Sequence, residues 1–325
     1  MAFRLKLVPD ETRINFFRWQ RYTFGLSALL MALSLIALLT MGLNFGIDFK
    51  GGTTIRTEST TAFDVGEYRA ALTGVEGIGD VSITEVFDPT FGADRHVAQV
   101  RIGASDDAEA MTPEQIARVE AALQAVDPEV RFAAVESVGP KVSAELIKKA
   151  AYAVTAASLG ILFYIWMRFE WQFAVGGVFA IVHDVLLTMG IFAVLQMRFD
   201  LSTIAALLTI LGYSINDTVV VFDRLRENLI KFRNMPLVDV MNLSVNETLS
   251  RTVMTAVTTI LALMALIVLG GDVIRGFVFA MLWGVIVGTY SSVYVAKNIV
   301  LWLGIKRDWS KPDPDKLPEQ FRESP

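Results

Sequence analysis

Residues 201–222 read LSTIAALLTILGYSINDTVVVF, and this stretch decides the fold. Its only charged side chain is Asp217, which stands in a polar segment, 212–218, between two apolar runs. A helix needs about 20 predominantly apolar residues to cross a hydrocarbon core of about 30 Å. The stretch is therefore predicted to span a membrane and to place a carboxylate inside it.

Five further stretches share this length and this apolar character. They lie at residues 22–47, 150–167, 171–197, 252–271 and 276–294. The composition agrees, because 53% of the 325 residues are hydrophobic and only 19% are charged, whereas about 25% are charged in a typical soluble domain. We therefore expect a multi-pass membrane protein with an all-α bundle of six helices, the first covering 22–43 and the other five lying within 150–304.

The composition also excludes several function classes. A net charge of −5 offers no basic surplus for neutralising phosphates, so no nucleic-acid partner is expected. The chain has no cysteine for disulfides or thiol chemistry, and its two histidines are too few for a His-rich metal site. The segment Lys50-Gly51-Gly52 lacks the other residues of a P-loop and is interpreted as a turn that enters a strand. We expect no cofactor, no metal and no enzymatic activity.

The distribution of lysine and arginine orients the bundle. With the N-terminus inside, the inner segments hold sixteen of these residues, and the two short outer loops hold only Arg198 and Arg275. Positive charge collects on the cytoplasmic side of membrane proteins. Residues 1–21, the loop 223–251 and the tail 305–325 are therefore expected in the cytoplasm. The first span follows basic residues, as a signal peptide does, but it is too long and lacks a small-residue cleavage site, so we expect it to be retained.

Residues 44–149, between the first two spans, are expected to form an acidic domain on the outer face, with 10 basic and 18 acidic side chains. Apolar residues at i, i+3, i+7 and i+10 predict two helices in it, with stripes that begin at Val65 and Ile116. Thr112-Pro113-Glu114-Gln115 is a capping sequence for the second helix. Strands are predicted at 52–57, 80–86, 96–102 and 130–135. The order β-α-β-β-α-β is typical of a ferredoxin-like α+β domain.

Charge inside the bilayer is the strongest indication of function. A charged side chain at the membrane centre costs about 2.5–3.5 kcal/mol on insertion scales, so it needs a partner, a proton or water. At about 1.5 Å per residue, Asp217 lies roughly 24 Å from Leu201, in the cytoplasmic half. Arg251 opens the fifth span from the same side, and its guanidinium is expected to reach the carboxylate. We interpret Asp217, Arg251 and Asn216 as a proton pathway. The alternatives are a structural carboxylate for Asp217 and an end anchor for Arg251.

A second polar position lies near the middle of the third span. Asp184 is about 17 Å into that span, and His183 precedes it. His183 is interpreted first as a hydrogen-bond donor between helices and second as a proton carrier of the pathway. Asp184 is either structural or part of the pathway. Elsewhere the simpler reading is preferred: Gly284 and Gly288 predict close helix packing, and residues 236–250 predict a helix at the membrane interface.

Several segments resemble one known family. The matching motifs lie at 45–53 (FGIDFKGGT), 137–142 (SVGPKV), 169–172 (FEWQ), 182–185 (VHDV), 212–224 (GYSINDTVVVFDR) and 246–252 (NETLSRT). On these residues the chain resembles the SecF side of the SecD/SecF family of bacterial protein-export membrane proteins, which is related to the resistance-nodulation-division (RND) transporters.

The resemblance implies one half of a pseudo-symmetric RND-type bundle with a ferredoxin-like outer domain, the other half being SecD. It associates a carboxylate at Asp217 and an arginine at Arg251 with proton passage. It implies an accessory subunit of the Sec translocase that uses the proton motive force to assist late translocation and release of secreted polypeptides. The expected partners are SecD, the SecYEG channel with its accessory subunits, the unfolded polypeptide, protons and the lipid bilayer. The expected location is the bacterial inner membrane, with 44–149 in the periplasm.

Two other functions are weighed against this one. An RND-type proton-coupled exporter of small molecules or lipids also combines membrane carboxylates with outer domains, but such exporters carry two large outer domains per chain. An intramembrane aspartyl protease would use Asp184 and Asp217 as its two catalytic carboxylates. Asp217 is not preceded by the glycine-rich segment of that class, and Arg251 would compete for it. The sequence leaves open whether sodium replaces the proton, and which outer-domain surface contacts the polypeptide.

Overall fold

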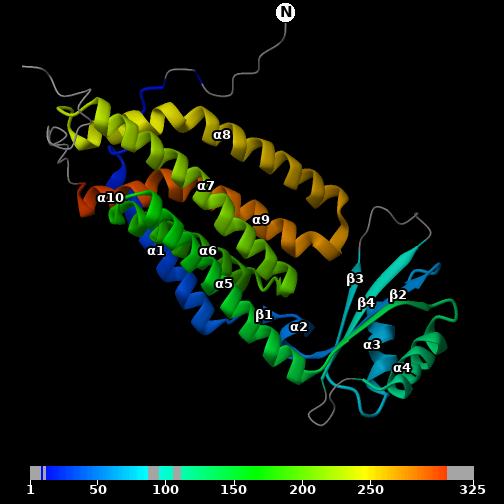
Figure 1. Cartoon of the computed structure of the whole chain (residues 1–325). Coiled ribbons are helices and arrows are strands. Elements are labelled where there is room, and N and C mark those ends of the chain that lie inside the picture. The colour runs from blue at the N-terminus through cyan, green and yellow to red at the C-terminus, as the bar shows by residue number, and fades with distance from the viewer. Residues whose placement is uncertain (1–8, 10–11, 87–94, 105–110, 306–325) are drawn as a thin grey trace, which may run out of the picture.

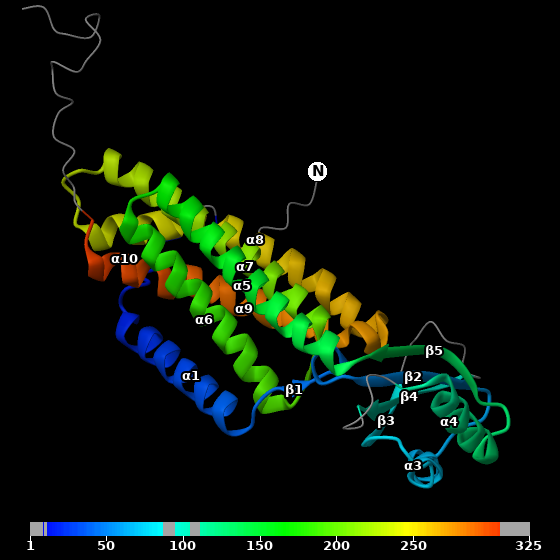
Figure 2. The ribbon, with the colours of Figure 1, turned by 60° about the horizontal axis from the view of Figure 1, so that its bottom comes forward.

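Six long apolar helices and a small sheet domain make up the described part of the chain (Figure 1). The structure is a computed structural model that describes residues 9, 12–86, 95–104 and 111–305. The sheet domain is attached at one end of the helical bundle, as two views show (Figures 1 and 2). The tail 305–325 and the first eleven residues, both predicted to be cytoplasmic, lie outside the described residues except for residues 9 and 305.

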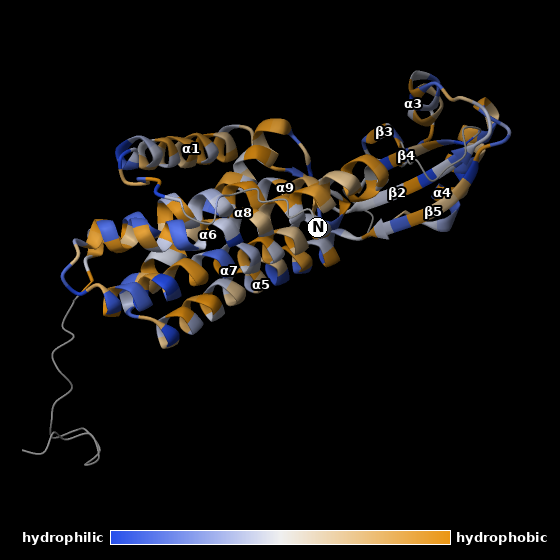
Figure 3. Cartoon of the chain, turned by 90° about the horizontal axis from the view of Figure 1, so that it is seen from above, coloured by the Kyte–Doolittle hydropathy of each residue, from blue (hydrophilic) through white to orange (hydrophobic). Residues whose placement is uncertain are grey.

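The predicted set of six membrane-spanning helices is confirmed by length and composition. The first five are α1 (Gln20–Thr40), α5 (Pro140–Arg168), α6 (Trp171–Leu195), α7 (Leu201–Lys231) and α8 (Leu237–Leu269). The sixth consists of α9 (Gly271–Ser291), the π-helical turn η1 (Ser292–Ala296) and α10 (Lys297–Leu303). Apolar residues dominate the middle of the bundle, and hydrophilic residues collect at the end remote from the sheet domain (Figure 3).

The helix ends differ from the prediction. Residues 236–250 do not form a separate interfacial helix, because α8 begins at Leu237 and continues without a break to Leu269. The connection predicted at 223–251 therefore shrinks to the residues between α7 and α8. Likewise α5 begins at Pro140 rather than near 150, and α1 ends at Thr40. A hydropathy criterion finds only the part of a helix that matches the hydrocarbon core, whereas 33 residues at about 1.5 Å each extend well beyond about 30 Å.

Close contact between α7 and α9 organises the bundle. A Cβ atom added at Gly284 would lie 2.3 Å from Cγ1 of Ile210, and one added at Gly288 would lie 3.1 Å from Cβ of Ser214. The small residues thus allow the two backbones to approach, as predicted. The central helices are α6 and α7, whose most apolar stretches are 50% and 44% buried, against 6% for α5. Much of the surface of α5, α8 and α1 is left for lipid or for another protein.

The outer domain has the predicted ferredoxin-like topology. Its elements are β2 (Gly52–Ser59), α3 (Val65–Thr73), β3 (Val81–Val86), β4 (His96–Gly103), α4 (Pro113–Val126) and β5 (Arg131–Val138). The antiparallel sheet has the order β3-β4-β2-β5, so the two βαβ units interleave. Helix α3 is capped by Asp64, and α4 by the predicted capping box of Thr112 and Gln115.

Two short elements attach this domain to the bundle. Strand β1 (Asn44–Phe45) pairs in parallel with β6 (Arg198–Phe199), which lies directly before α7. Helix α2 (Ile47–Lys50) follows, and its Asp48 carboxylate accepts the backbone N–H of Leu201 at 3.0 Å. The chain then turns towards β2 at Gly51 and Gly52, whose φ angles are 76° and 131°. The predicted strand-entry turn is confirmed, and the start of α7 is held to the entrance of the outer domain.

Candidate functional site

Helix α7 divides the polar segment 212–218 between two of its faces. Ser214, Asp217 and Thr218 are buried in the bundle, whereas Gly212 and Asn216 are exposed. This division follows from about 3.6 residues per helical turn, because positions three or four apart share a face. The structure therefore places Asn216, which was predicted to belong with Asp217, on the outer surface of the bundle.

Asp217 is a buried carboxylate without a bonded partner in the described part of the chain. Its residue is 2% exposed, its side chain takes part in no hydrogen bond among those residues, and its Oδ2 atom is completely buried. Arg251 exerts an electrostatic effect on it, but no nitrogen of Arg251 lies within 4.0 Å of its oxygens. The predicted direct contact between the two is thus not formed in this arrangement.

Arg251 lies in an open polar groove at the end of the bundle remote from the outer domain. The groove, about 470 Å³, lies between α5, α7 and α8. Its other charged groups are mostly paired: Arg168 with Asp223 at 3.1 Å, and Arg224 with both Glu227 and Glu247, at 2.6 and 2.8 Å. The arginine is exposed.

Asp184 has the opposite environment to Asp217. His183 Nδ1 lies 2.8 Å from its Oδ1, while the hydroxyls of Ser214 and Ser291 donate to its Oδ2 at 2.5 and 2.8 Å. All four residues are at most 1% exposed. The carboxylate thus joins α6, α7 and α9. His183 contacts its own helix neighbour instead of donating between helices, and its ring stacks on Tyr290 with centroids 6.1 Å apart.

Three polar residues of the bundle were not predicted as functional. Ser214 and Ser291 complete the Asp184 cluster, and Ser291 was detectable because it follows Gly284 and Gly288 at positions i+7 and i+3 on the α7-facing side. Lys297 is 1% exposed, and its Nζ has no hydrogen bond. It lies 4.2–5.4 Å from the ring centroids of Phe16, Phe17 and Tyr294. The predicted last span ended at residue 294, before this lysine.

The geometry can support proton exchange more readily than peptide-bond hydrolysis. Both oxygens of Asp184 accept hydrogen bonds, and within the described chain Asp217 shares none with Asp184. An aspartyl protease needs two carboxylates that act on one water. No group of three or more His, Asp or Glu residues that could hold a metal ion occurs among the residues that the structure describes.

Comparison with known proteins gives one consistent family. The model for the protein export membrane protein SecD/SecF C-terminal domain matches residues 118–306, and the SecD/SecF GG motif matches 36–62, which includes Gly51 and Gly52. The protein translocase subunit SecF of Cereibacter sphaeroides is 68% identical over 321 residues, covering 99% of this chain and 98% of that protein.

Solved structures agree with the sequence comparison. The crystal structure of SecDF from Thermus thermophilus superposes with a TM-score of 0.80 at 37% identity, covering 91% of this chain. The super-membrane-facing form of SecDF gives a TM-score of 0.67 at 38% identity, covering 92% of this chain. This chain spans only 39% and 40% of the length of those two proteins. Because the sequence matches along nearly its whole length and the architecture is shared, the chain belongs to the SecD/SecF family of protein export membrane proteins, on the SecF side.

Proposed function

We propose that this protein is an accessory subunit of the Sec translocase that works with a SecD subunit and uses proton flow to assist protein export. The observation that carries the proton step is Asp217, which is buried in a membrane-spanning helix and has no hydrogen-bond partner in the described structure. A charge in that position costs about 2.5–3.5 kcal/mol on insertion scales. Proton binding removes that cost, and no hydrogen bond has to be broken for it.

The membrane potential supplies enough energy for a conformational change. One elementary charge that crosses 100 mV releases about 2.3 kcal/mol, which shifts a two-state equilibrium roughly fifty-fold. In the proposed cycle, Arg251 approaches the ionised carboxylate and leaves the protonated one. The exposed position of Arg251 in the groove supports such a movement.

Helix α7 offers a route from this site to the outer domain. Asp217 lies on α7, and the same helix begins at Leu201, whose N–H is bound by Asp48 at the entrance to the outer domain. The β1–β6 pairing adds a second connection at that end. We infer that a shift of α7 after proton exchange tilts the outer domain, which would then hold or release the exported polypeptide.

A SecD subunit would cover an unusual exposed face of α7. Ala205, Thr209, Gly212 and Asn216 are exposed and recur at intervals of four, three and four residues, so they form one stripe, the α7 stripe. Small and polar residues are typical of contacts between membrane helices, whereas lipid gives no partner to an asparagine amide. We therefore place SecD on the α7 stripe, next to Asp217 and Arg251.

The proposed membrane and the proposed channel partner follow from the family, and the proposed orientation follows from the distribution of basic residues. The protein would reside in the bacterial inner membrane with both termini in the cytoplasm, the outer domain in the periplasm and the SecYEG channel nearby. The ion pairs of Arg168 and Arg224 lie at the predicted cytoplasmic end, as the positive-inside rule requires. An exporter of small molecules finds no specific support in this geometry.

The proton step is tested with Asp217→Asn. Complexes with SecD and the channel, reconstituted in vesicles, should lose the stimulation of export by a proton gradient, because an amide cannot exchange the proton. The matched control is Asp223→Asn, the same chemical change on the same helix at a half-exposed position paired with Arg168. Full stimulation in the Asp217→Asn complex would contradict the proposal.

The SecD contact is tested with Gly212→Leu. A Cβ at Gly212 meets nothing within 4 Å in this chain, so the substitution leaves the fold intact but blocks the close approach of another helix. Co-purification with SecD should fall strongly. Gly25→Leu is the control, since Gly25 is equally open and lies on α1. Equal SecD recovery with both variants would remove the α7 stripe as the interface.

A further inference from the structure

The sheet of the outer domain has one face covered by helices and one open face. Residues alternate between the two faces of a strand. Ile55 on β2 and Val100 on β4 are fully buried in the core with α3 and α4. Thr54 and Arg56 therefore belong to the open face, together with Arg101, which is the cross-strand partner of Thr54. The open face of this sheet carries polar and cationic side chains.

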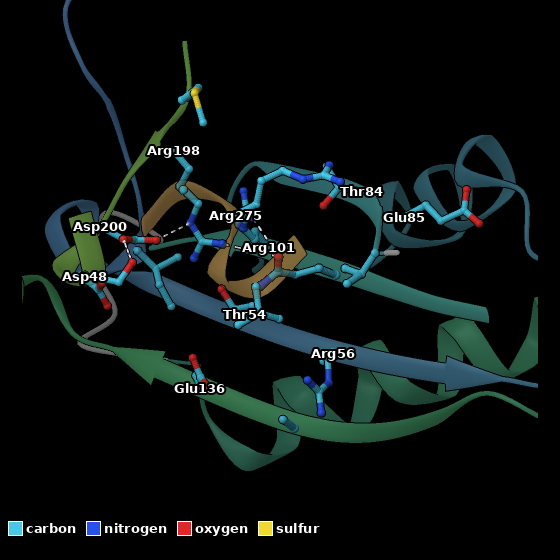
Figure 4. Close-up of a pocket in the computed structure, with 18 residues that line it drawn as sticks. Asp48, Thr54, Arg56, Thr84, Glu85, Arg101, Glu136, Arg198, Asp200 and Arg275 are labelled. Atoms are coloured by element: carbon cyan, nitrogen blue, oxygen red, sulfur yellow. Dashed lines mark hydrogen bonds and ion pairs between the residues drawn. The ribbon is translucent and has the colours of Figure 1, made fainter. Parts of the chain in front are cut away.

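The bundle closes that open face into a cavity of about 550 Å³, here called the joint cavity. Its second wall consists of the connection between α6 and α7, including Arg198 and Asp200, and of the start of α9, including Arg275. Figure 4 shows Arg101, Arg198 and Arg275 close together, with Thr54 and Arg56 on the adjoining strand β2. The volume lies within the range of about 300–1,000 Å³ that is usual for ligand sites.

Several polar atoms in the joint cavity have no partner in the described protein, although Arg101 and Arg198 each donate one terminal N–H to Oε1 of Gln99, at 2.9 and 3.4 Å. The Nε atoms of Arg56, Arg101 and Arg198 are buried and have no hydrogen-bond partner in the described structure, and the same holds for Oγ1 of Thr54, a residue only 4% exposed. Buried polar groups are normally paired, so each such group requires an explanation. Four of them around one cavity indicate a missing acceptor.

The acidic residues beside the cavity do not fill this role. Asp48 accepts the N–H of Leu201, and Asp200 accepts the N–H of Thr203 as the N-cap of α7. Asp200 lies 3.8 Å from Nε of Arg198, too far for a hydrogen bond. Glu85 and Glu136 are exposed at the rim. The carboxylates nearest to the cations are thus already used by the backbone.

The cations also repel one another. The pKa of Arg101 is lowered to about 10, first by burial and then by the positive charge of Arg198, and the negative charge of Asp200 offsets this only in part. The guanidinium remains protonated at neutral pH, so its charge stays in the cavity. An anion bound between Arg101 and Arg198 would relieve both effects, because it compensates the charge and accepts the free N–H groups.

The position of the cavity identifies the class of anion. Helix α6 ends at Leu195, α7 begins at Leu201 and α9 begins at Gly271, so the bundle wall lies where the membrane-crossing segments end. Phospholipid phosphates lie at this level of a bilayer. A planar guanidinium group can donate two parallel hydrogen bonds to two oxygens of one phosphate. We propose that the joint cavity binds a phosphate group, supplied by a phospholipid headgroup, between the outer domain and the bundle.

The proposal is tested on the purified full-length chain in a neutral detergent. The melting temperature is followed by intrinsic fluorescence while dioctanoyl phosphatidylglycerol is added. Dioctanoylglycerol has the same chains without phosphate, inorganic phosphate supplies the anion without chains, and sodium chloride at equal ionic strength controls for screening. Phosphatidylglycerol should raise the melting temperature in a saturable manner, whereas dioctanoylglycerol and chloride should not.

Variants connect that shift to the joint cavity. Arg101→Gln should raise the half-saturating concentration of phosphatidylglycerol about tenfold, equivalent to about 1.4 kcal/mol. Arg69→Gln is the matched control, because it removes the same charge from an exposed position on α3, on the helical side of the domain. If Arg101→Gln cannot be purified, Arg198→Gln on the bundle wall makes the same test.

The outcomes discriminate clearly. A shift with phosphatidylglycerol that Arg101→Gln weakens and Arg69→Gln retains supports a headgroup site. If inorganic phosphate gives the same shift at the same concentration, the phosphate site stands, with a free anion as its source. The proposal is overturned if chloride or dioctanoylglycerol reproduces the shift, if no additive produces one, or if Arg101→Gln responds as the unaltered chain does.

Discussion

Replacement of Asp184 by leucine removes the acceptor on which three helices converge. Before the change, the carboxylate accepts from His183 and from the hydroxyls of Ser214 and Ser291, at 2.8, 2.5 and 2.8 Å. Leucine is similar in size and has no polar atom. The substitution therefore tests the hydrogen bonds with little change in packing.

The magnitude follows from what the three donors can find afterwards. The Ser291 hydroxyl also contacts the carbonyl of Gly288 at 3.1 Å and keeps that partner. His183 Nδ1 and the Ser214 hydroxyl have no other partner in the described structure. An unsatisfied buried donor costs about 1–3 kcal/mol, but hydrogen bonds within membranes average about 0.6 kcal/mol. We expect Asp184→Leu to lower the free energy of unfolding by about 2 kcal/mol.

Asp184→Asn is the informative companion. Its amide oxygen still accepts from His183, and its NH₂ group donates to the serine oxygens while Ser291 donates to Gly288. Only the O–H of Ser214 loses its acceptor, so the loss should be about 0.6 kcal/mol, the average for one hydrogen bond within a membrane. Unfolding by SDS in mixed micelles, followed by tryptophan fluorescence, measures both variants. Equal destabilisation by leucine and asparagine would refute the reasoning, because the negative charge and not the hydrogen bonds would then hold the helices. Adding Ser214→Ala to Asp184→Leu should recover part of the loss.

Three further predictions concern packing, ionisation and capping. Gly284→Ala places a Cβ 2.3 Å from Ile210 and should cost about 1–3 kcal/mol in SDS unfolding, a loss that Ile210→Ala reverses in part. Burial and the carboxylate of Asp127 raise the pKa of Tyr68 above its ordinary value of 10. Above pH 10 the unfolded chain therefore loses a proton that the folded chain keeps, and the free energy of unfolding should fall by up to about 1.4 kcal/mol per pH unit. Tyr68→Phe should abolish this slope in alkaline unfolding curves. Thr112→Ala removes a cap from α4 and should lower the urea stability of the outer domain by about 1 kcal/mol, whereas an unchanged midpoint would contradict the capping role.

The six spans and the ferredoxin-like domain can be predicted from the sequence because the patterns that indicate them lie within single segments of the chain. Apolar length identifies a span, and the period-3.6 stripes beginning at Val65 and Ile116 identify the outer-domain helices. Helix ends were predicted poorly, since nothing in hydropathy marks where a helix stops once it has left the bilayer. Residues 236–250 illustrate this: the sequence predicts a separate interfacial helix there, whereas residues 237–250 form the first part of α8.

The candidate site was predictable in its members and not in its contacts. Depth and charge selected Asp217 and Asp184, but hydrogen-bond partners depend on how helices from distant parts of the chain pack. Ser291 reaches Asp184 across more than one hundred residues of sequence. Asn216 shows the converse. Its place next to Asp217 in the sequence predicts a shared role, but successive residues of a helix point about 100° apart, and Asn216 lies on the exposed face.

Asp184 and Asp217 are the two buried carboxylates of the described bundle, and their surroundings assign them different parts in the proposed cycle. A proton that binds Asp184 weakens the hydrogen bonds that the ionised carboxylate accepts from three donors. A proton that binds Asp217 disturbs no hydrogen bond in the described structure. Ser214, three residues before Asp217 on the same helical face, is the α7 contact of the Asp184 cluster. In the proposed cycle α7 therefore responds to the proton at Asp217 while the bond between Ser214 and Asp184, less than one turn away, fixes the point about which the helix moves.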